Sequence, residues 1–276
     1  MRIAWASDVH FDFVEREQVV AWCREIAAAG AEALLLGGDI ADARSLGGWL
    51  ELVAEELSPR PVYFVLGNHD YYHGSIAAVR ARARASRAIW LPSAGPVFLD
   101  EETALVGAGG WGDARVGNFA ASPVRLNDYR LIEDLAGANF DHALLQPLLQ
   151  AEGDREASAL RGPLQAALSA RGRVLVLTHV PPFREACWHE GRTSDDDWAP
   201  GFVCGATGAL LLTEAAAHPT RELTVFCGHT HSPGWARSAP NLVTHTLGAE
   251  YGAPAFVVFE TKGLASFSPP GAPPRG

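Results

Sequence analysis

The stretch "GNHD", residues 67–70, stands directly after the apolar run "VYFVL", residues 62–66. A turn would account for its first two residues, but a turn does not account for His69 and Asp70 beside them. An apolar strand that ends in an imidazole and a carboxylate places acid–base and metal-binding groups at one edge of a sheet. The meaning of this stretch therefore depends on the residues at the ends of the other strands.

Four further apolar runs end in the same kind of polar cluster. The pairs are "RIAWAS" before "DVH", "EALLL" before "GGD", "RVLVL" before "THVPP" and "LTVFC" before "GHTH". Helix-like stretches lie between several of the runs, at residues 15–29, 44–57, 74–88, 155–170 and 206–217. Strands that are apolar throughout are typical of a sheet covered on both faces. Their alternation with helices predicts an α/β fold.

Two groups of shorter runs indicate antiparallel pairing. "AIWL", "PVFLD" and "TALVGAGG" follow one another within residues 88–110, and "NLVTHTL" and "PAFVVFE" stand near the end of the sequence. Short runs so close together favour adjacent antiparallel strands, which predicts two sheets or one mixed sheet. No linker divides the sequence, so we predict one domain over residues 1–268. The Pro/Gly-rich tail, residues 269–276, is expected to be disordered.

Composition narrows the class of protein. The 276 residues carry a formal net charge of −10, which disfavours a nucleic-acid partner because phosphate binding needs a basic face. No apolar run is long enough to span a membrane, and no secretory leader pattern is visible. The four cysteines, at positions 23, 187, 204 and 227, form no C-x-x-C pair. We therefore expect free thiols and a cytoplasmic location, whereas the oligomeric state stays open.

The polar clusters together supply a set of metal-ligand side chains. They contain Asp8, His10, Asp39, Asn68, His69, Asp70, His179, His229 and His231. Each alone would more often cap a strand or a turn, but five strands that all end in such residues are poorly explained by accident. Imidazole, carboxylate and amide ligands without a thiolate suit Mn, Fe, Zn, Co or Ni. The set exceeds the needs of one ion, which predicts two divalent metal ions bridged by a shared carboxylate.

The order "DVH", "GGD", "GNHD", "TH" and "GHTH" resembles the signature of the calcineurin-like metallophosphoesterases, and these motifs span residues 8–231. The resemblance implies a four-layer α/β/β/α sandwich, with two mixed sheets flanked by helices and a dinuclear site at the strand ends. It implies that Asp8, His10 and His231 bind one metal, that Asn68, His179 and His229 bind the other, and that Asp39 bridges them. It also implies that His69 stabilises the transition state or protonates the leaving oxygen, with Asp70 orienting His69.

The chemistry of phosphoester hydrolysis fits this ligand set. Two cations would neutralise the anionic ester and lower the pKa of a bridging water, and the resulting hydroxide would attack phosphorus in line. A histidine is suited to give the leaving oxygen its proton. We therefore predict a hydrolase of small phosphoesters, either a phosphomonoesterase or a phosphodiesterase. A cyclic-nucleotide or nucleotide phosphodiesterase, a non-catalytic metal-binding scaffold and a dinuclear oxygenase are the alternatives.

Five further residues are candidates for contact with substrate or for support of the ligands. Trp111, Asp113, Asp128 and Arg130 lie in "GGWGDARVG" and "RLNDYRLIEDL", segments that resemble a Trp-containing loop and an "NDYR"-like stretch of some bacterial members of the family. His73 follows "GNHD" closely. The alternative interpretations are that Trp111 packs in the core, that Asp128 caps a turn and that His73 starts a helix. The long loop over residues 184–205 is expected to be functional or mobile.

Overall fold

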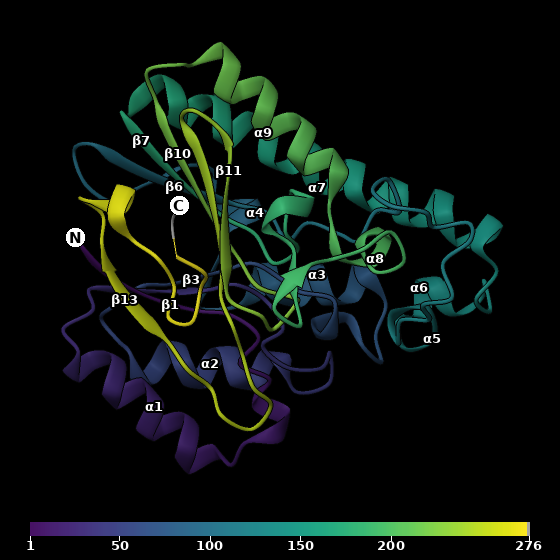
Figure 1. The fold of residues 1–276 in the computed structure, drawn as a ribbon. Helices are drawn as coiled ribbons and strands as arrows, with labels where there is room; N and C mark the ends of the chain where they lie inside the picture. Colours follow the sequence, from purple (N-terminus) through teal and green to yellow (C-terminus); the bar gives the residue numbers. More distant parts are fainter. Residues whose placement is uncertain (275–276) are drawn as a thin grey trace.

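The computed structural model describes residues 1–274 and contains two large sheets stacked face to face (Figure 1). The first sheet has the strand order β13-β1-β2-β3-β4. Its strands are β1 (Arg2–Ala6), β2 (Ala33–Leu36), β3 (Val62–Phe64), β4 (Ile89–Trp90) and β13 (Val257–Glu260). Strands β1 to β4 run parallel, and β13 pairs antiparallel with β1. The sheet is therefore mixed.

The second sheet has the strand order β11-β12-β10-β7-β6-β5. Its strands are β5 (Val97–Phe98), β6 (Thr103–Gly107), β7 (Arg173–Leu177), β10 (Glu222–Cys227), β11 (Gly234–Ala239) and β12 (Leu242–Thr246). The four inner strands are parallel, whereas the edge strands β5 and β11 are antiparallel to their neighbours. A separate hairpin, β8 (Trp188–His189) and β9 (Arg192–Thr193), lies in the loop after β7.

Helices cover the outer faces of both sheets. The helices of the described residues are α1 (Arg16–Ala28), α2 (Leu46–Glu56), α3 (Ile76–Ala85), α4 (Leu91–Ala94), α5 (Asp128–Leu131), α6 (Glu133–Ala136), α7 (His142–Ala170), α8 (Ala199–Phe202) and α9 (Gly205–Ala217). Short 3-10 helices are η1 (Phe11–Phe13), η2 (His69–Tyr71), η3 (Arg184–Ala186) and η4 (Leu264–Ser266). In Figure 1, α1 and α2 lie below the first sheet and α7 and α9 lie above the second.

Side-chain alternation along the strands builds the layers. In β1, Ile3 and Trp5 point into the space between the sheets, whereas Ala4 and Ala6 point towards the outer helices, because successive strand residues face opposite sides. All four are fully buried. A third apolar cluster joins the second sheet to α7 and α9. The predicted four-layer α/β/β/α arrangement of two mixed sheets flanked by helices is confirmed.

The local signals in the sequence account for several boundaries. Helix α1 begins with a capping box, in which the side chains of Glu15 and Gln18 each bind the other's backbone N–H, as expected for a helix start. The chain leaves α1 at Gly30, which has a φ of 73°. Glycine adopts this left-handed conformation without a steric penalty. These features place α1 within one residue of the predicted stretch 15–29.

The predicted antiparallel pairs are correct only in part. "PVFLD" and "TALVGAGG" form the antiparallel pair β5–β6, but "AIWL" forms β4, which pairs parallel with β3 in the other sheet. "NLVTHTL" and "PAFVVFE" form β12 and β13, which also lie in different sheets. Runs that are close in sequence were expected to pair with each other. Short strands such as β4 and β13 instead occupy the edges of the first sheet, because a short strand can pair at an edge of either sheet. β13 instead closes the first sheet beside β1.

The predictions on the cysteines, on membrane-spanning segments and on the C-terminal tail can be compared with the structure. The four cysteines are free thiols, and all four are buried. No helix among residues 1–274 is long and apolar enough to cross a membrane. In the predicted tail, the Trp235 indole nitrogen donates a hydrogen bond to the Pro273 carbonyl at 3.0 Å, while residues 275–276 lie outside the described residues. The domain boundary at residue 268 and the cytoplasmic location stay predictions.

Candidate metal centre

The loops at the ends of five strands meet at one edge of the stacked sheets. Asp8 and His10 follow β1, Asp39 follows β2, Asn68 follows β3, His179 follows β7, and His229 and His231 follow β10. Five of these seven residues, Asp8, His10, Asp39, His229 and His231, have a positive φ between 42° and 71°. Non-glycine residues rarely adopt this conformation, and such strain concentrates at functional sites. The loops are therefore held in shapes that aim these side chains inward.

Two glycines let the loops approach one another closely. A Cβ on Gly67 would collide with Asp39 Oδ1, and a Cβ on Gly228 would collide with Asp8 Oδ2. Neither glycine has a positive φ. The sequence suggested a turn at Gly67. The structure shows that Gly67 and Gly228 leave space for the carboxylates of two neighbouring loops.

The first donor group consists of Asp8, His10, Asp39 and His231, whose ligand atoms all lie within 4.8 Å of one another. The Nε2 atoms of His10 and His231 are 3.2 Å apart. Asp39 Oδ2 lies 3.8 Å from His10 Nε2, and Asp8 Oδ1 lies 3.4 Å from His231 Nε2. These spacings suit donors arranged around a single cation.

The second donor group lies on the other oxygen of the same carboxylate. Asp39 Oδ1 is 3.4 Å from His179 Nε2. That nitrogen is also 3.1 Å from Asn68 Oδ1 and 3.1 Å from His229 Nδ1. The structure thus brings together all seven predicted metal ligands, and Asp39 presents one oxygen to each group.

Backbone contacts fix the protons of the second group. His179 Nδ1 lies 2.9 Å from the Gly37 carbonyl, and His229 Nε2 lies 3.1 Å from the Gly201 carbonyl. A carbonyl can only accept, so these two nitrogens carry the ring protons, and the nitrogens that face the site carry lone pairs. The facing lone pairs of His179 and His229 and the Asn68 oxygen converge without a donor. Such a set of acceptors fits a divalent cation.

The protonation states of the cluster also favour the binding of cations. Burial lowers the pKa of His10 to about 4 and that of His229 to about 3, so both imidazoles are neutral and able to bind metal near neutral pH. Burial, reinforced by the Asp8 and Asp70 carboxylates, raises the pKa of Asp39 well above its ordinary value. A buried carboxylate of this kind needs positive charge beside it to stay ionised. Two cations would supply that charge.

Asn68 is held by a residue from a distant segment. Its Nδ2 donates a hydrogen bond to Asp128 Oδ1 at 2.9 Å, and the Tyr72 hydroxyl donates to the same oxygen at 2.7 Å. Asp128 is buried, and burial raises its pKa. By binding the amide nitrogen, Asp128 leaves the amide oxygen of Asn68 facing His179. The candidate Asp128 therefore reaches the site, through contact with a ligand residue.

The predicted contact between Asp70 and His69 is not formed in this structure. The Asp70 carboxylate accepts hydrogen bonds from the backbone N–H groups of Ile40, Ala41 and Gly67, at 2.7–3.0 Å. Asp70 is completely buried and joins the loop after β2 to the loop after β3. Its three backbone partners use the carboxylate oxygens, which explains why the carboxylate turns away from the imidazole. Asp70 therefore shapes the backbone that carries Asp39.

His69 lies at the edge of the cluster. Its Nε2 is 3.9 Å from Asp39 Oδ2, and its side chain is 25% exposed. Its ring stacks on Tyr72 with a centroid distance of 4.2 Å. Burial, and the neighbouring histidines His10 and His179, lower its pKa to about 2, so the imidazole is neutral. A neutral ring in this place can donate one hydrogen bond to a group bound in the site.

The remaining candidates lie further from the donors. Trp111 is buried and packs on Tyr71, with ring centroids 5.3 Å apart. Arg130 is exposed, and its guanidinium contacts Asn127 Oδ1 at 3.4 Å. The backbone N–H of His73 donates to the Leu131 carbonyl, and its side chain lines a cavity beside the site. Whether these residues affect catalysis stays a prediction.

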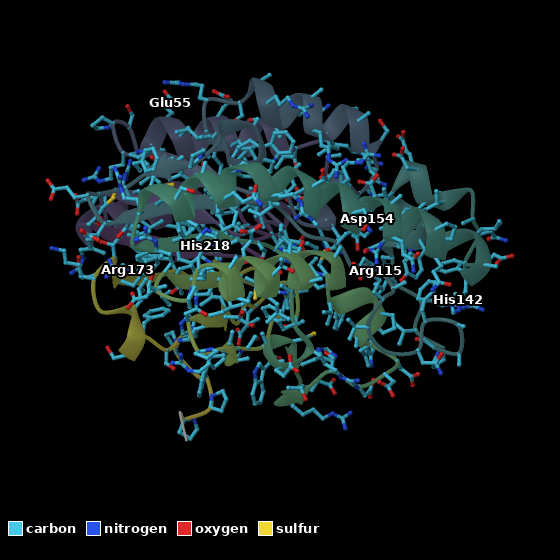
Figure 2. The ribbon with its side chains drawn as sticks, turned by 90° about the horizontal axis from the view of Figure 1, so that it is seen from above. Glu55, Arg115, His142, Asp154, Arg173 and His218 are labelled. Carbon is cyan, nitrogen blue, oxygen red and sulfur yellow. The ribbon has the colours of Figure 1, made fainter. Side chains whose placement is uncertain are left out.

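Asp113 supports the site indirectly. Its carboxylate accepts from the backbone N–H groups of Gly205 and Ala206 at the start of α9. It also pairs with Arg115, which pairs in addition with Asp154 of the long helix α7 at 2.8 Å. Figure 2 labels Arg115 and Asp154. This cap fixes the chain just after α8, and α8 contains the Gly201 carbonyl that binds His229.

One cavity opens at the donors and a second adjoins it at His69, and the walls of both include residues that the motifs did not indicate. The first, of about 330 Å³, is floored by Asp39, Asn68, His229 and His231. The second, of about 440 Å³, adjoins it. The lining residues that the motifs did not indicate are Asp12, Phe13, Asp42, Tyr72, Leu126, Asn127, Leu131, Thr230 and Tyr251, together with His189 and Phe202 of the loop over residues 184–205. Only proximity to the motifs could have indicated Phe13 and Tyr72, whereas Tyr251 lies in the loop between β12 and β13 and carried no signal.

The family model of the calcineurin-like phosphoesterases matches residues 1–233, which is most of the chain and contains every ligand described above. The protein therefore belongs to the calcineurin-like phosphoesterase family. No match to the chain was found among the curated proteins.

One of three similar solved structures supports the fold assignment. A dimetal phosphatase from Danio rerio is similar, with a TM-score of 0.56 and 18% identity over 94% of this chain and 91% of that one. A protein of Thermus thermophilus has a TM-score of 0.48 and 14% identity, over 90% of this chain and 88% of that one. A 5'-nucleotidase from Candida albicans has a TM-score of 0.42 and 10% identity, over 90% of this chain and 45% of that one. Only the first score is high enough to support the fold assignment.

Proposed function

We propose that this protein is a dinuclear metal-dependent hydrolase of small phosphoesters. The observation that carries the proposal is the position of Asp39, which presents Oδ2 to His10 and Oδ1 to His179. One carboxylate shared by two groups of donors is the arrangement of two-metal phosphoesterase sites. The family to which the chain belongs supports the same reaction class.

The residues would divide into two sets. Asp8, His10 and His231 would hold one ion, Asn68, His179 and His229 the other, and Asp39 both. When bound, two divalent cations neutralise the charge of the ester and lower the pKa of water, which supplies the nucleophile. The ligand types accept Mn, Fe, Zn, Co or Ni. Ser7 and the backbone N–H of His229 hold the Asp8 carboxylate at 2.6–3.0 Å and so fix one wall of the site.

The reaction adds water across a P–O bond. The oxygen of water bonds to phosphorus, the bond to the leaving oxygen breaks, and the proton that the water loses is balanced by the proton that the leaving oxygen gains. His69 lies at the edge of the donors with its ring open to the cavity. We propose that its N–H group donates a hydrogen bond to the oxygen on which charge develops, which stabilises the transition state. Of the two roles expected from the sequence, a neutral imidazole favours this one over transfer of a proton from an imidazolium.

The proposal is tested by hydrolysis with added metal. The protein is assayed with Mn²⁺ or Ni²⁺ against p-nitrophenyl phosphate and bis-p-nitrophenyl phosphate, which also separates monoesterase from diesterase activity. We expect turnover of at least one ester, and its loss in Asp39→Ala. Folded protein that shows no turnover with any first-row divalent metal would contradict the proposal. Cyclic nucleotides and nucleotide diesters form a second panel, which tests the alternative substrate class.

A further inference from the structure

We infer that the second cavity receives the leaving group of the ester, and that Tyr251 makes this cavity select apolar or aromatic leaving alcohols without a further anionic group. The inference rests on the proposed function. We name this cavity the leaving-group cleft; its walls include Asp12, Phe13, Asp42, Tyr72, Leu131 and Tyr251.

The position of the cleft follows from His69. This side chain lines both cavities, together with Tyr72, Asn127 and Tyr251. A phosphoryl group over Asp39 would place its leaving oxygen next to the His69 ring, because His69 Nε2 is 3.9 Å from Asp39 Oδ2. The carbon skeleton attached to that oxygen then extends past His69. The leaving-group cleft is the space on that side.

Aromatic rings form the wall of the cleft. Tyr251 packs against His10 with a centroid distance of 4.3 Å, against His231 at 5.0 Å and against Phe13 at 5.0 Å. Its ring therefore covers the first donor group and faces the cleft. Tyr251 is nevertheless 51% exposed and Phe13 is 60% exposed. Adjacent exposed aromatic side chains at the mouth of a site mark a surface that a ligand covers.

The charge of the cleft limits what can occupy it. No arginine or lysine among residues 1–274 lines either cavity, whereas the Asp12 and Asp42 carboxylates line the cleft. The Asp12 oxygens are held by the backbone N–H of Asp42 and by the Ser45 hydroxyl, each at 2.5 Å, so this negative charge is fixed in place. A leaving group with a second phosphate would meet like charge without a cationic partner. A neutral apolar group would meet aromatic faces instead.

Three homologous alkyl phosphates test the inference: 2-phenylethyl phosphate, ethyl phosphate and ethylene glycol bisphosphate, each used as the monoester and as its methyl diester. The metal-loaded protein should hydrolyse the 2-phenylethyl ester with a kcat/KM at least about ten-fold above that of the ethyl ester, and the bisphosphate should be the poorest substrate. Tyr251→Ala should reduce the preference for phenylethyl over ethyl to less than about three-fold. Tyr251→Phe should keep the preference, because the ring makes the contact.

Phe98→Ala is the matched control. Phe98 is 50% exposed but lies on β5, where it contacts Arg171, so its removal should leave all three kcat/KM values unchanged. The inference is overturned if the bisphosphate is preferred, or if Tyr251→Ala lowers the kcat/KM of the phenylethyl and ethyl esters by the same factor. Folded, metal-loaded protein that hydrolyses none of the esters would contradict the proposed function itself, and this inference with it.

Discussion

The amide nitrogen of Asn68 donates to Asp128 Oδ1 at 2.9 Å, and the amide oxygen of Asn68 lies 3.1 Å from His179 Nε2. The carboxylate of Asp128 thus decides which end of the amide faces the metal centre. Partners of metal ligands commonly matter for metal affinity in this way.

Removal of Asp128 should weaken the second metal site selectively. In Asp128→Ala, the Asn68 amide loses the acceptor that orients it, so we expect the affinity of the second ion to fall by about 10–100-fold while the first ion is retained. Asp128→Asn keeps an acceptor oxygen and should lose less. Calorimetric titration of the metal-free protein with Mn²⁺ measures both sites. Equal losses at both sites would show that Asp128 does not act through Asn68.

His69→Ala should lower turnover without removing metal. The neutral imidazole of His69 is proposed to stabilise charge in the transition state, so its loss should reduce kcat by about 10²–10³-fold. Metal content, measured by elemental analysis, should stay at the wild-type value because His69 belongs to neither donor group. If the substitution strips an ion, His69 is a ligand and the assignment is wrong.

Asp113→Ala should destabilise the fold. The change removes the acceptor for two N–H groups at the start of α9 and leaves Arg115 with one partner fewer, so the free energy of unfolding should fall by about 1–2 kcal/mol. Urea denaturation measures this. Asp154→Ala is the control, because Asp154 is the exposed partner of the same arginine (Figure 2); its loss should cost less than about 0.5 kcal/mol. Equal effects would contradict the capping role of Asp113.

The cysteines give a prediction for pH dependence. Burial raises the pKa of the Cys187 and Cys204 thiols from 9.0 to about 12. The folded state therefore holds these protons more tightly than the unfolded state, so the resulting stability is present below pH 9 and is lost as the pH rises from 9 to 12. At pH 8, Ellman's reagent should label no thiol rapidly in native protein and four after denaturation. Rapid labelling of the native protein would contradict the burial of the thiols.

Local patterns in the sequence predicted the α/β class and the polar residues at the strand ends, whereas the four-layer arrangement and the division of the ligands between two metals were implied by the resemblance to the calcineurin-like metallophosphoesterases. Apolar runs marked every strand that precedes a ligand, although the six-residue edge strand β11 has no such run, and parallel strands deliver their carboxyl ends to one edge of a sheet. The pairing of β4 and β13 could not be predicted, since a run of two to four paired residues carries no information on its partner strand. The role of Asp70 was missed because three backbone N–H groups compete for its carboxylate. Tyr251 was missed because its position depends on the loop between strands of two different sheets.

The central claim is that Asp39 joins two metal sites, and metal stoichiometry tests it most directly. Wild-type protein is loaded with Mn²⁺ and freed of excess metal. Elemental analysis by inductively coupled plasma mass spectrometry should then find two ions per chain. His179→Ala should contain about one ion, and Asp39→Ala should retain less than one, because both sites lose a shared ligand. His218→Ala, which changes the histidine directly after α9 (Figure 2) and removes a residue of neither donor group, should keep two. One ion per chain in the wild type, or two in Asp39→Ala, would contradict the account.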